Sequence, residues 1–113
     1  MEYGKMTDHI ILEKGLHVEC PTRKQFEAWL TVNGYGLDVD YESDRFSCWY
    51  KGMTEILVYN QGSDMWLAQK ATEAIEHLAF STISHYVQTP MGQQGVYKTK
   101  SEIYKEIMEF PKE

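Results

Sequence analysis

The chain has 113 residues, of which 42% are hydrophobic and 25% charged, a composition typical of one globular domain over residues 1–113 rather than of a disordered or collagen-like chain. Seventeen acidic residues against eleven basic ones give a formal net charge of −6. This charge argues against direct nucleic-acid binding, because such affinity comes from neutralising phosphates. No apolar run approaches the ~20 residues of a membrane-spanning helix, so we expect a cytoplasmic protein without a membrane partner.

The first predicted elements are a β-hairpin and a helix. Two apolar runs, at residues 9–13 and 16–20, flank a short glycine-containing connection, which is the pattern of a hairpin. A capping box follows, since the Thr22 hydroxyl can accept a hydrogen bond from the Gln25 amide while the Gln25 side chain reaches back. We therefore expect a helix over residues 22–33, with an aromatic face that packs onto a sheet.

A β-meander is predicted next. Residues 37–41 form its weakest strand, residues 45–50 alternate well enough for a second strand, and residues 53–59 are rich in β-forming side chains. Together with the N-terminal hairpin, these strands are expected to make a small antiparallel sheet with helices on one face.

A long helix is predicted after the meander. Apolar residues recur at helical spacing as far as Val87, and Pro90 disfavours helical geometry at the residue before it. The pattern therefore favours a helix over residues 64–88. Phe80 begins a stretch that could kink it, so the sequence leaves open whether this helix is continuous.

A loop and a third helix complete the predicted fold. Residues 92–95 are expected to form the loop. Thr99 and Glu102 make a second capping box, and the helix that they open must stop before Pro111. The predicted order is ββ-α-βββ-α-α, an α+β fold with about three helices.

Candidate residues for catalysis, metal binding and disulfide formation are few. His77 and His85 lie eight residues apart on the expected long helix, so they point in different directions and cannot share a metal ion. Ser81 could contact His77 at i, i+4, but no nucleophile elbow or oxyanion loop accompanies them. We therefore expect no catalytic residues, metal ion or cofactor. Cys20 and Cys48 are interpreted as buried thiols, although a disulfide between them stays open.

The acidic residues of the meander are more informative. Asp38, Asp40, Glu42 and Asp44 occur at alternate positions with no basic residue among them. In an extended strand, alternate side chains point the same way at intervals of about 6.6 Å. Two interpretations remain open: an edge strand kept acidic to prevent strand pairing, or an electrostatic docking surface for a basic partner.

Aromatic residues lie close to this acidic segment in the sequence. Because strand residues alternate in direction, Trp49 and Tyr50 cannot both face inward, so one of them lies on the face opposite to the helices. Aromatic side chains beside acidic ones are typical of a protein-binding surface. We therefore predict a partner-binding site composed of Asp38, Asp40, Tyr41, Glu42, Asp44, Trp49 and Tyr50.

Residues 19–35, with the sequence ECPTRKQFEAWLTVNGY, resemble a pattern in short phage and prophage proteins. In these proteins a strand runs into Cys-Pro-Thr, a helix follows, and Gly-Tyr leads to a small antiparallel sheet. The resemblance covers part of the chain, and it is to a class of proteins rather than to a named family. It implies an accessory protein of a mobile element, of the type of the anti-CRISPR proteins and other inhibitors of host defence.

The sequence thus predicts a non-enzymatic, phage-encoded inhibitor. It would bind a host protein and cover a basic or nucleic-acid-binding surface of a defence nuclease with its acidic, aromatic-rich face. The first alternative is a small-ligand or nucleotide-binding domain, which could be dimeric, and the second is a small hydrolase-like enzyme.

Overall fold

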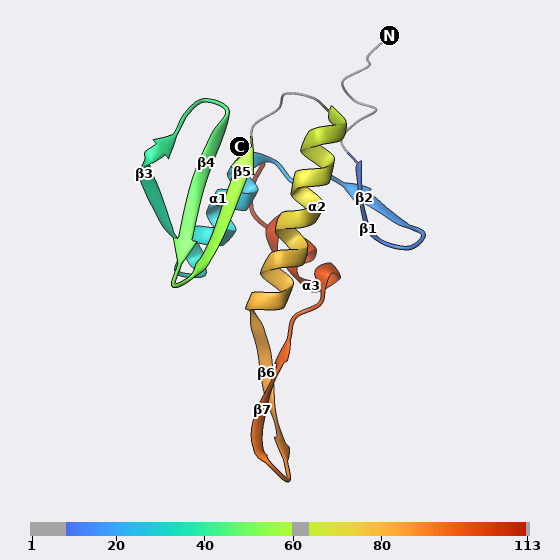
Figure 1. The fold of residues 1–113 in the computed structure, drawn as a ribbon. Coiled ribbons are helices and arrows are strands. Elements are labelled where there is room, and N and C mark those ends of the chain that lie inside the picture. Colours follow the sequence, from blue (N-terminus) through green and yellow to red (C-terminus); the bar gives the residue numbers. More distant parts are fainter. Residues whose placement is uncertain (1–8, 60–63, 113) are drawn as a thin grey trace.

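The computed structural model describes residues 9–59 and 64–112, without the side chains of residues 64–69 (Figure 1). Within these residues three helices and seven strands follow one another as β1 (His9–Glu13), β2 (Leu16–Glu19), α1 (Arg23–Val32), β3 (Gly36–Glu42), β4 (Phe46–Lys51), β5 (Thr54–Tyr59), α2 (Asp64–Ser81), β6 (Ile83–Thr89), β7 (Gly92–Tyr97) and α3 (Lys100–Met108). The predicted α+β class is confirmed.

Both predicted capping boxes are present. The Gln25 amide donates to Thr22 Oγ1 at 3.2 Å, and the Thr22 amide donates to Gln25 Oε1 at 2.9 Å. Thr99 and Glu102 repeat the arrangement at 3.1 and 2.9 Å. These bonds satisfy amides that the first turn of a helix leaves without a partner, so α1 and α3 begin where the sequence predicts them.

The expected helix over residues 64–88 is confirmed as far as residue 81 and is wrong for residues 82–88. α2 ends at Ser81, whose hydroxyl donates to the backbone oxygen of His77 at 2.8 Å. After Thr82 the chain continues as β6 and β7, which pair as an antiparallel hairpin. The element order is therefore ββ-α-βββ-α-ββ-α.

Local side-chain preference explains this difference. Ile83, Tyr86 and Val87 fit helical spacing, but residues 82–89 are mostly β-branched or aromatic, and such side chains favour extended backbone. The expected loop over residues 92–95 belongs to β7. The strand preference of the whole segment thus outweighs the helical spacing of these three apolar residues.

The strands form three separate antiparallel sheets, β1–β2, β3–β4–β5 and β6–β7, so the N-terminal hairpin and the meander do not join into one sheet. α2 lies between them and contacts both β1 and β5 (Figure 1). Its apolar stripe of Ala71, Ile75 and Leu78 is buried. Because α2 packs against both sheets, it separates the N-terminal hairpin from the meander, which the sequence suggested were neighbours in one sheet.

One hydrophobic core connects β1, α1, the meander, α2 and α3. Trp29 is buried in it, and its indole N–H donates to Glu106 Oε1 on α3 at 3.0 Å. Gln25 is also buried, and its amide group donates to the backbone oxygen of Phe110 at 2.9 Å. The fully buried apolar side chains come from every one of these layers except the meander: Ile10, Leu12, Trp29, Leu30, Ile75, Leu78, Ile103 and Ile107.

The β6–β7 hairpin, residues 83–97, is called the arm below. It projects from the C-terminal end of α2, away from the meander (Figure 1), in a molecule that measures 58 × 38 × 22 Å. Every residue of β6 except Thr89 is exposed. The arm therefore consists of paired backbone with almost no core of its own.

Candidate functional site

The predicted acidic residues lie on an edge of the molecule. β3 is the outer strand of the meander, and Asp40, Glu42 and Asp44 are exposed while Asp38 is half-buried. These four residues are called the acidic edge below. The turn that carries Asp44 is held against α1, because the Arg23 guanidinium donates to the backbone oxygens of residues 43, 44 and 46 at 3.0–3.3 Å.

The acidic edge is not the evenly spaced row that an ideal strand would give. Leu37 pairs with Trp49 and Glu42 pairs with Ser47, so the register of β3 against β4 shifts between Leu37 and Glu42. Within this stretch Asp38 Oδ1 accepts a hydrogen bond from the Asp40 amide at 3.1 Å. Glu42 consequently lies on the α1 side of the sheet, and Asp38, next to Leu37, faces the other side. The carboxylates spread around the edge.

Five ion pairs lie away from Asp38, Asp40 and Glu42. They join α1 internally (Arg23–Glu27), α2 internally (Lys70–Glu73), and the C-terminal region to its neighbours (Lys98–Glu106, Lys100–Glu76 and Lys112–Glu19). Among the described residues, Asp38, Asp40 and Glu42 form no ion pair. Segment 36–59 carries five acidic and two basic residues, so the meander holds an uncompensated negative charge.

The structure separates the three predicted aromatic anchors. Tyr41 is 63% exposed and Tyr50 is 41% exposed, whereas Trp49 is 7% exposed and belongs to the core. The Trp49 indole N–H donates to Ser47 Oγ at 2.9 Å, and Ser47 in turn donates to Glu27 on α1 at 2.7 Å. Trp49 therefore faces α1 and is removed from the partner-binding set. Alternation along β4 predicts that Trp49 and Tyr50 point to opposite faces of the sheet, but it does not predict which of them faces the helices.

A small polar network lies on the open face of the meander. The Tyr50 hydroxyl donates to Glu55 Oε2 at 2.6 Å, and the Cys48 thiol donates to the same oxygen at 3.4 Å. The bond from Tyr50 lowers the pKa of Glu55, and the bond to Glu55 raises the pKa of Tyr50 well above its ordinary value. Glu55 thus stays charged on β5, which β4 separates from the acidic edge.

Both cysteines are buried, and no disulfide bond joins Cys20 to Cys48. Burial raises the pKa of the Cys48 thiol, which lowers its thiolate content and its reactivity.

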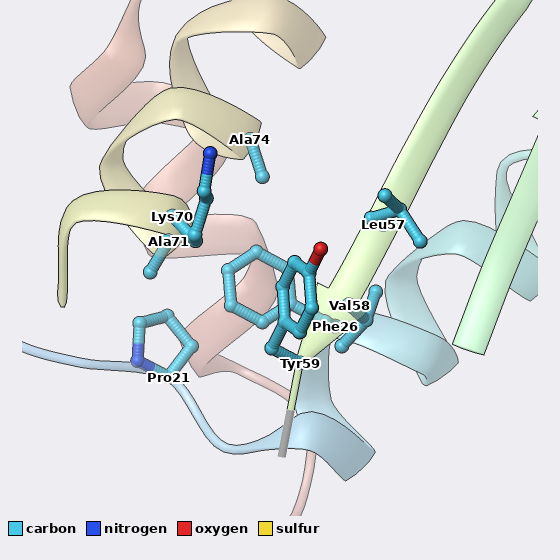
Figure 2. A pocket seen from close by; sticks show the side chains of 8 residues that line it. All are labelled: Pro21, Phe26, Leu57, Val58, Tyr59, Lys70, Ala71 and Ala74. Carbon is cyan, nitrogen blue, oxygen red and sulfur yellow. The ribbon is translucent and has the colours of Figure 1, made fainter. Parts of the chain in front are cut away.

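A groove runs between β5 and α2 (Figure 2). Its apolar part holds about 10 Å³, the space of one water molecule. Figure 2 shows the rings of Phe26 and Tyr59 in its middle, with Pro21 and Ala71 on one side and Leu57 and Val58 on the other. A more open cleft of about 280 Å³ adjoins it and includes Glu55, Glu73 and Lys70. Lys70 Nζ already lies 3.1 Å from Glu73, so the charges of this cleft disfavour a phosphate-bearing nucleotide.

The histidines and Ser81 do not assemble a catalytic arrangement. The Ser81 hydroxyl donates to a backbone oxygen, and His85 lies on β6, where its Nδ1 is 3.2 Å from Ser84 Oγ. The expected position of His85 on a helix shared with His77 is therefore wrong. No cluster of three or more His, Cys, Asp or Glu side chains suited to a metal ion occurs in residues 9–59 and 70–112.

Sequence reasoning missed the arm, which carries the largest group of exposed apolar side chains outside the meander. Tyr86, Met91 and Tyr97 on the arm are between 54% and 96% exposed, and Phe80 at the adjoining end of α2 is 70% exposed. A signal was available, since no Asp, Glu, Lys or Arg occurs in residues 77–97, which is unusual for the exposed surface of a charged protein.

The chain matches no family model, and no curated protein or solved structure shows significant similarity to it. Within the described residues, the helices are all too short or too polar to cross a bilayer.

Proposed function

We propose that the chain is a non-enzymatic protein-binding module that covers a basic, nucleic-acid-binding surface of a partner. The observation that carries this proposal is the acidic edge, where Asp38, Asp40 and Glu42 form no ion pair among the described residues. Tyr41 extends from the same strand with 63% of its surface exposed. Unpaired carboxylates supply long-range attraction, and exposed tyrosine supplies contact area once the partner is bound.

The two contributions act at different stages of binding. Charge accelerates the diffusional encounter and acts over about 10 Å at 0.1 M salt. Tyr41 and Tyr50 act at short range, because their rings must be covered by the partner before they contribute. The acidic edge should therefore govern the association rate, and the two tyrosines should govern the dissociation rate.

The partner class follows from the resemblance of residues 19–35 to short phage and prophage proteins. That resemblance supports a host defence nuclease, whose nucleic-acid channel is basic. An inhibitor that occupies such a channel competes with the phosphate backbone for the same cations. In this proposal the chain inhibits the nuclease by excluding its substrate.

The test compares two variants with the same change in charge. The first carries Asp38→Asn, Asp40→Asn, Glu42→Gln and Asp44→Asn, and the second neutralises Glu13, Glu73, Glu76 and Glu109 to Gln. After capture of a partner from a host lysate, association and dissociation rates are measured at low and high salt. We expect the first variant to associate about tenfold more slowly at low salt, with the second variant close to wild type.

The same experiment contains the result that would contradict the proposal. Equal association rates for wild type and the first variant at low salt would show that the acidic edge does not dock the partner. More light scattering from that variant, with normal binding, would instead favour the protection of an edge strand. A DNA competitor added to the captured complex tests the partner class, because it should displace the chain from a nuclease channel.

A further inference from the structure

The arm is a sheet of two strands with both faces in solvent. One face carries Ile83, Tyr86 and Tyr97, because Ile83 pairs with Tyr97 and Tyr86 pairs with Gly95. These three apolar side chains are between 39% and 61% exposed. An isolated two-stranded hairpin is marginally stable in water, and further strands or a packed face are needed to support it. The arm therefore lacks, within one chain, the packing that supports the other sheets.

Charge restricts what can cover the arm. The whole chain has a net charge of −6, yet residues 77–97 contain no Asp, Glu, Lys or Arg. Edge strands are usually protected by charged side chains that prevent pairing with another chain, and both strands of the arm lack this protection. A charged partner surface would find no opposite charge on the arm. An uncharged partner surface would meet no electrostatic repulsion there.

The tip and the base of the arm have complementary shapes. Met91 at the tip is 96% exposed. At the base, a hollow of about 390 Å³ lies between α2, β7 and α3, and its apolar lining is Ala79, Phe80 and Tyr97. The cations beside it are already paired, Lys98 with Glu106 and Lys100 with Glu76. The hollow, whose lining also includes Glu13, is large enough to admit a methionine side chain.

Gly95 lets the side chain of Ile83 lie over the backbone of β7. A Cβ at this position would lie 3.1 Å from Ile83 Cδ1, and Tyr86 lies directly across from Gly95. Ile83 therefore fills the space over Gly95, on the same face as Tyr86.

We propose that the arm binds the arm of a second copy of this chain. The two arms pack through their aromatic faces in opposite directions about a two-fold axis. Met91 of each copy then enters the hollow at the base of the other. Such an interface is self-complementary, as a symmetric dimer requires. The acidic edges lie away from the arms (Figure 1), so the net charge opposes this contact only weakly.

The exposed area is sufficient for a dimer. Phe80, Tyr86 and Tyr97 are 70%, 61% and 54% exposed, which at roughly 200 Å² per aromatic side chain leaves on the order of 400 Å² uncovered. Met91 at the tip and Ile83 on the aromatic face add further apolar surface. A stable interface takes about 800 Å² from each partner, and the arm with its base can supply it.

The first test uses two exposed methionines as a matched pair. Met91 lies at the tip of the arm, and Met53, which is fully exposed, lies at the turn between β4 and β5. In sedimentation over a concentration series we expect wild type and Met53→Glu to approach twice the chain mass of 13.2 kDa. Met91→Glu should raise the dissociation constant of the dimer at least about tenfold, because it places a charge in an apolar hollow.

The second test fixes the direction of the arms. Met91→Cys and Ser101→Cys chains are mixed and treated with a short bismaleimide, since Ser101 lines the hollow and both native thiols are buried. We expect crosslinks between the two different chains, and few when Met53→Cys replaces Met91→Cys. Crosslinks between two Met91→Cys chains would overturn the opposed arrangement.

A mass of 13.2 kDa at every concentration, or a dimer that Met91→Glu leaves intact, overturns the proposal. The arm of such a monomer is then tested against vesicles of zwitterionic phosphatidylcholine, and binding that Met91→Glu abolishes would assign the arm to a membrane surface instead. This inference does not depend on the acidic edge, so either proposal can fail without the other.

Discussion

The two hairpins β1–β2 and β6–β7 have similar local structures and opposite surroundings. Each is an antiparallel pair that turns through a glycine with positive φ, Gly15 at +83° and Gly92 at +114°, and each leads into a helix that begins with a capping box. β1 buries Ile10 and Leu12, whereas β6 buries none of its residues. Both hairpins therefore have the same kind of strand pairing. Only β1–β2 also gains free energy from burying apolar side chains.

The difference comes from what lies next to each hairpin. β1 rests on α2, whose apolar stripe faces it, while the arm extends beyond the end of α2 (Figure 1). At about 25 cal/mol per Å² of buried apolar area, the covered side chains of β1 contribute several kcal/mol that β6 lacks in a single chain. The comparison teaches that apolar alternation specifies a strand but does not specify what covers it.

Amide hydrogen exchange should show the largest difference between the hairpins. In dilute protein, the paired amides of β1–β2 should exchange at rates close to those of global unfolding. Those of the arm should exchange through local opening, several orders of magnitude faster. Equal protection in the two hairpins at the lowest concentration would show that the arm is stable without a partner. Slower exchange of the arm at higher concentration is expected from its association.

A matched pair of isoleucines gives the next largest effect. Ile10 is 2% exposed and Ile83 is 39% exposed. Ile10→Ala should lower the free energy of unfolding by about 2–5 kcal/mol, because it leaves a cavity in the core. Ile83→Ala should lower it by less than about 1 kcal/mol. Urea unfolding of dilute protein measures both, and similar losses would contradict the assignment of the two environments.

The two capping boxes provide a smaller and equal effect. Thr22→Ala and Thr99→Ala each remove the hydroxyl that accepts the amide three residues later, so each should lower the free energy of unfolding by about 1 kcal/mol. The Thr22 hydroxyl also donates to the backbone oxygen of Lys112 at 3.2 Å, a bond exposed to water. If Thr22→Ala lowers the free energy of unfolding several times more than Thr99→Ala does, the bond to Lys112 also contributes to stability. Urea unfolding again gives the measurement.

The smallest effect distinguishes the capping boxes by pH. The Thr99 amide holds the pKa of Glu102 below its ordinary value, whereas α1 has the uncharged Gln25 in the corresponding position. Because the folded pKa is the lower one, ionised Glu102 contributes stability above the unfolded pKa of about 4.3, and this is lost as pH falls through the folded pKa. The difference in the free energy of unfolding between wild type and Glu102→Gln should therefore shrink as the pH is lowered through that window. Glu109→Gln serves as the control, and a constant difference would contradict the assignment.

Local signals predicted much of the fold. The Thr22 and Thr99 capping boxes and the alternation in the meander depend on residues close together in the sequence, and they were confirmed. The arm was missed because Ile83, Tyr86 and Val87 fit helical spacing, whereas the β-branched and aromatic side chains of the segment favour a strand, and no core contact decides between them. A short apolar segment without tertiary support is the hardest case for periodicity.

The candidate site shows a similar division. Exposure of Asp40, Tyr41 and Glu42 follows from charge and edge position, which the sequence indicates. The burial of Trp49 depends on which face of β4 meets α1, and the spread of the carboxylates depends on the register shift after Leu37. Both are set by packing between elements far apart in the chain.

The attachment of α3 to α1 has a consequence for synthesis on the ribosome. The Gln25 side chain bonds to the backbone oxygen of Phe110, 85 residues later, and Ile103 and Ile107 are fully buried in the shared core. At 5–20 residues per second, these 85 residues take roughly 4–17 s to translate, whereas a helix forms in about a microsecond or less. The side of α1 that contacts α3 therefore stays uncovered until α3 leaves the exit tunnel, and this part of the core closes in a late step.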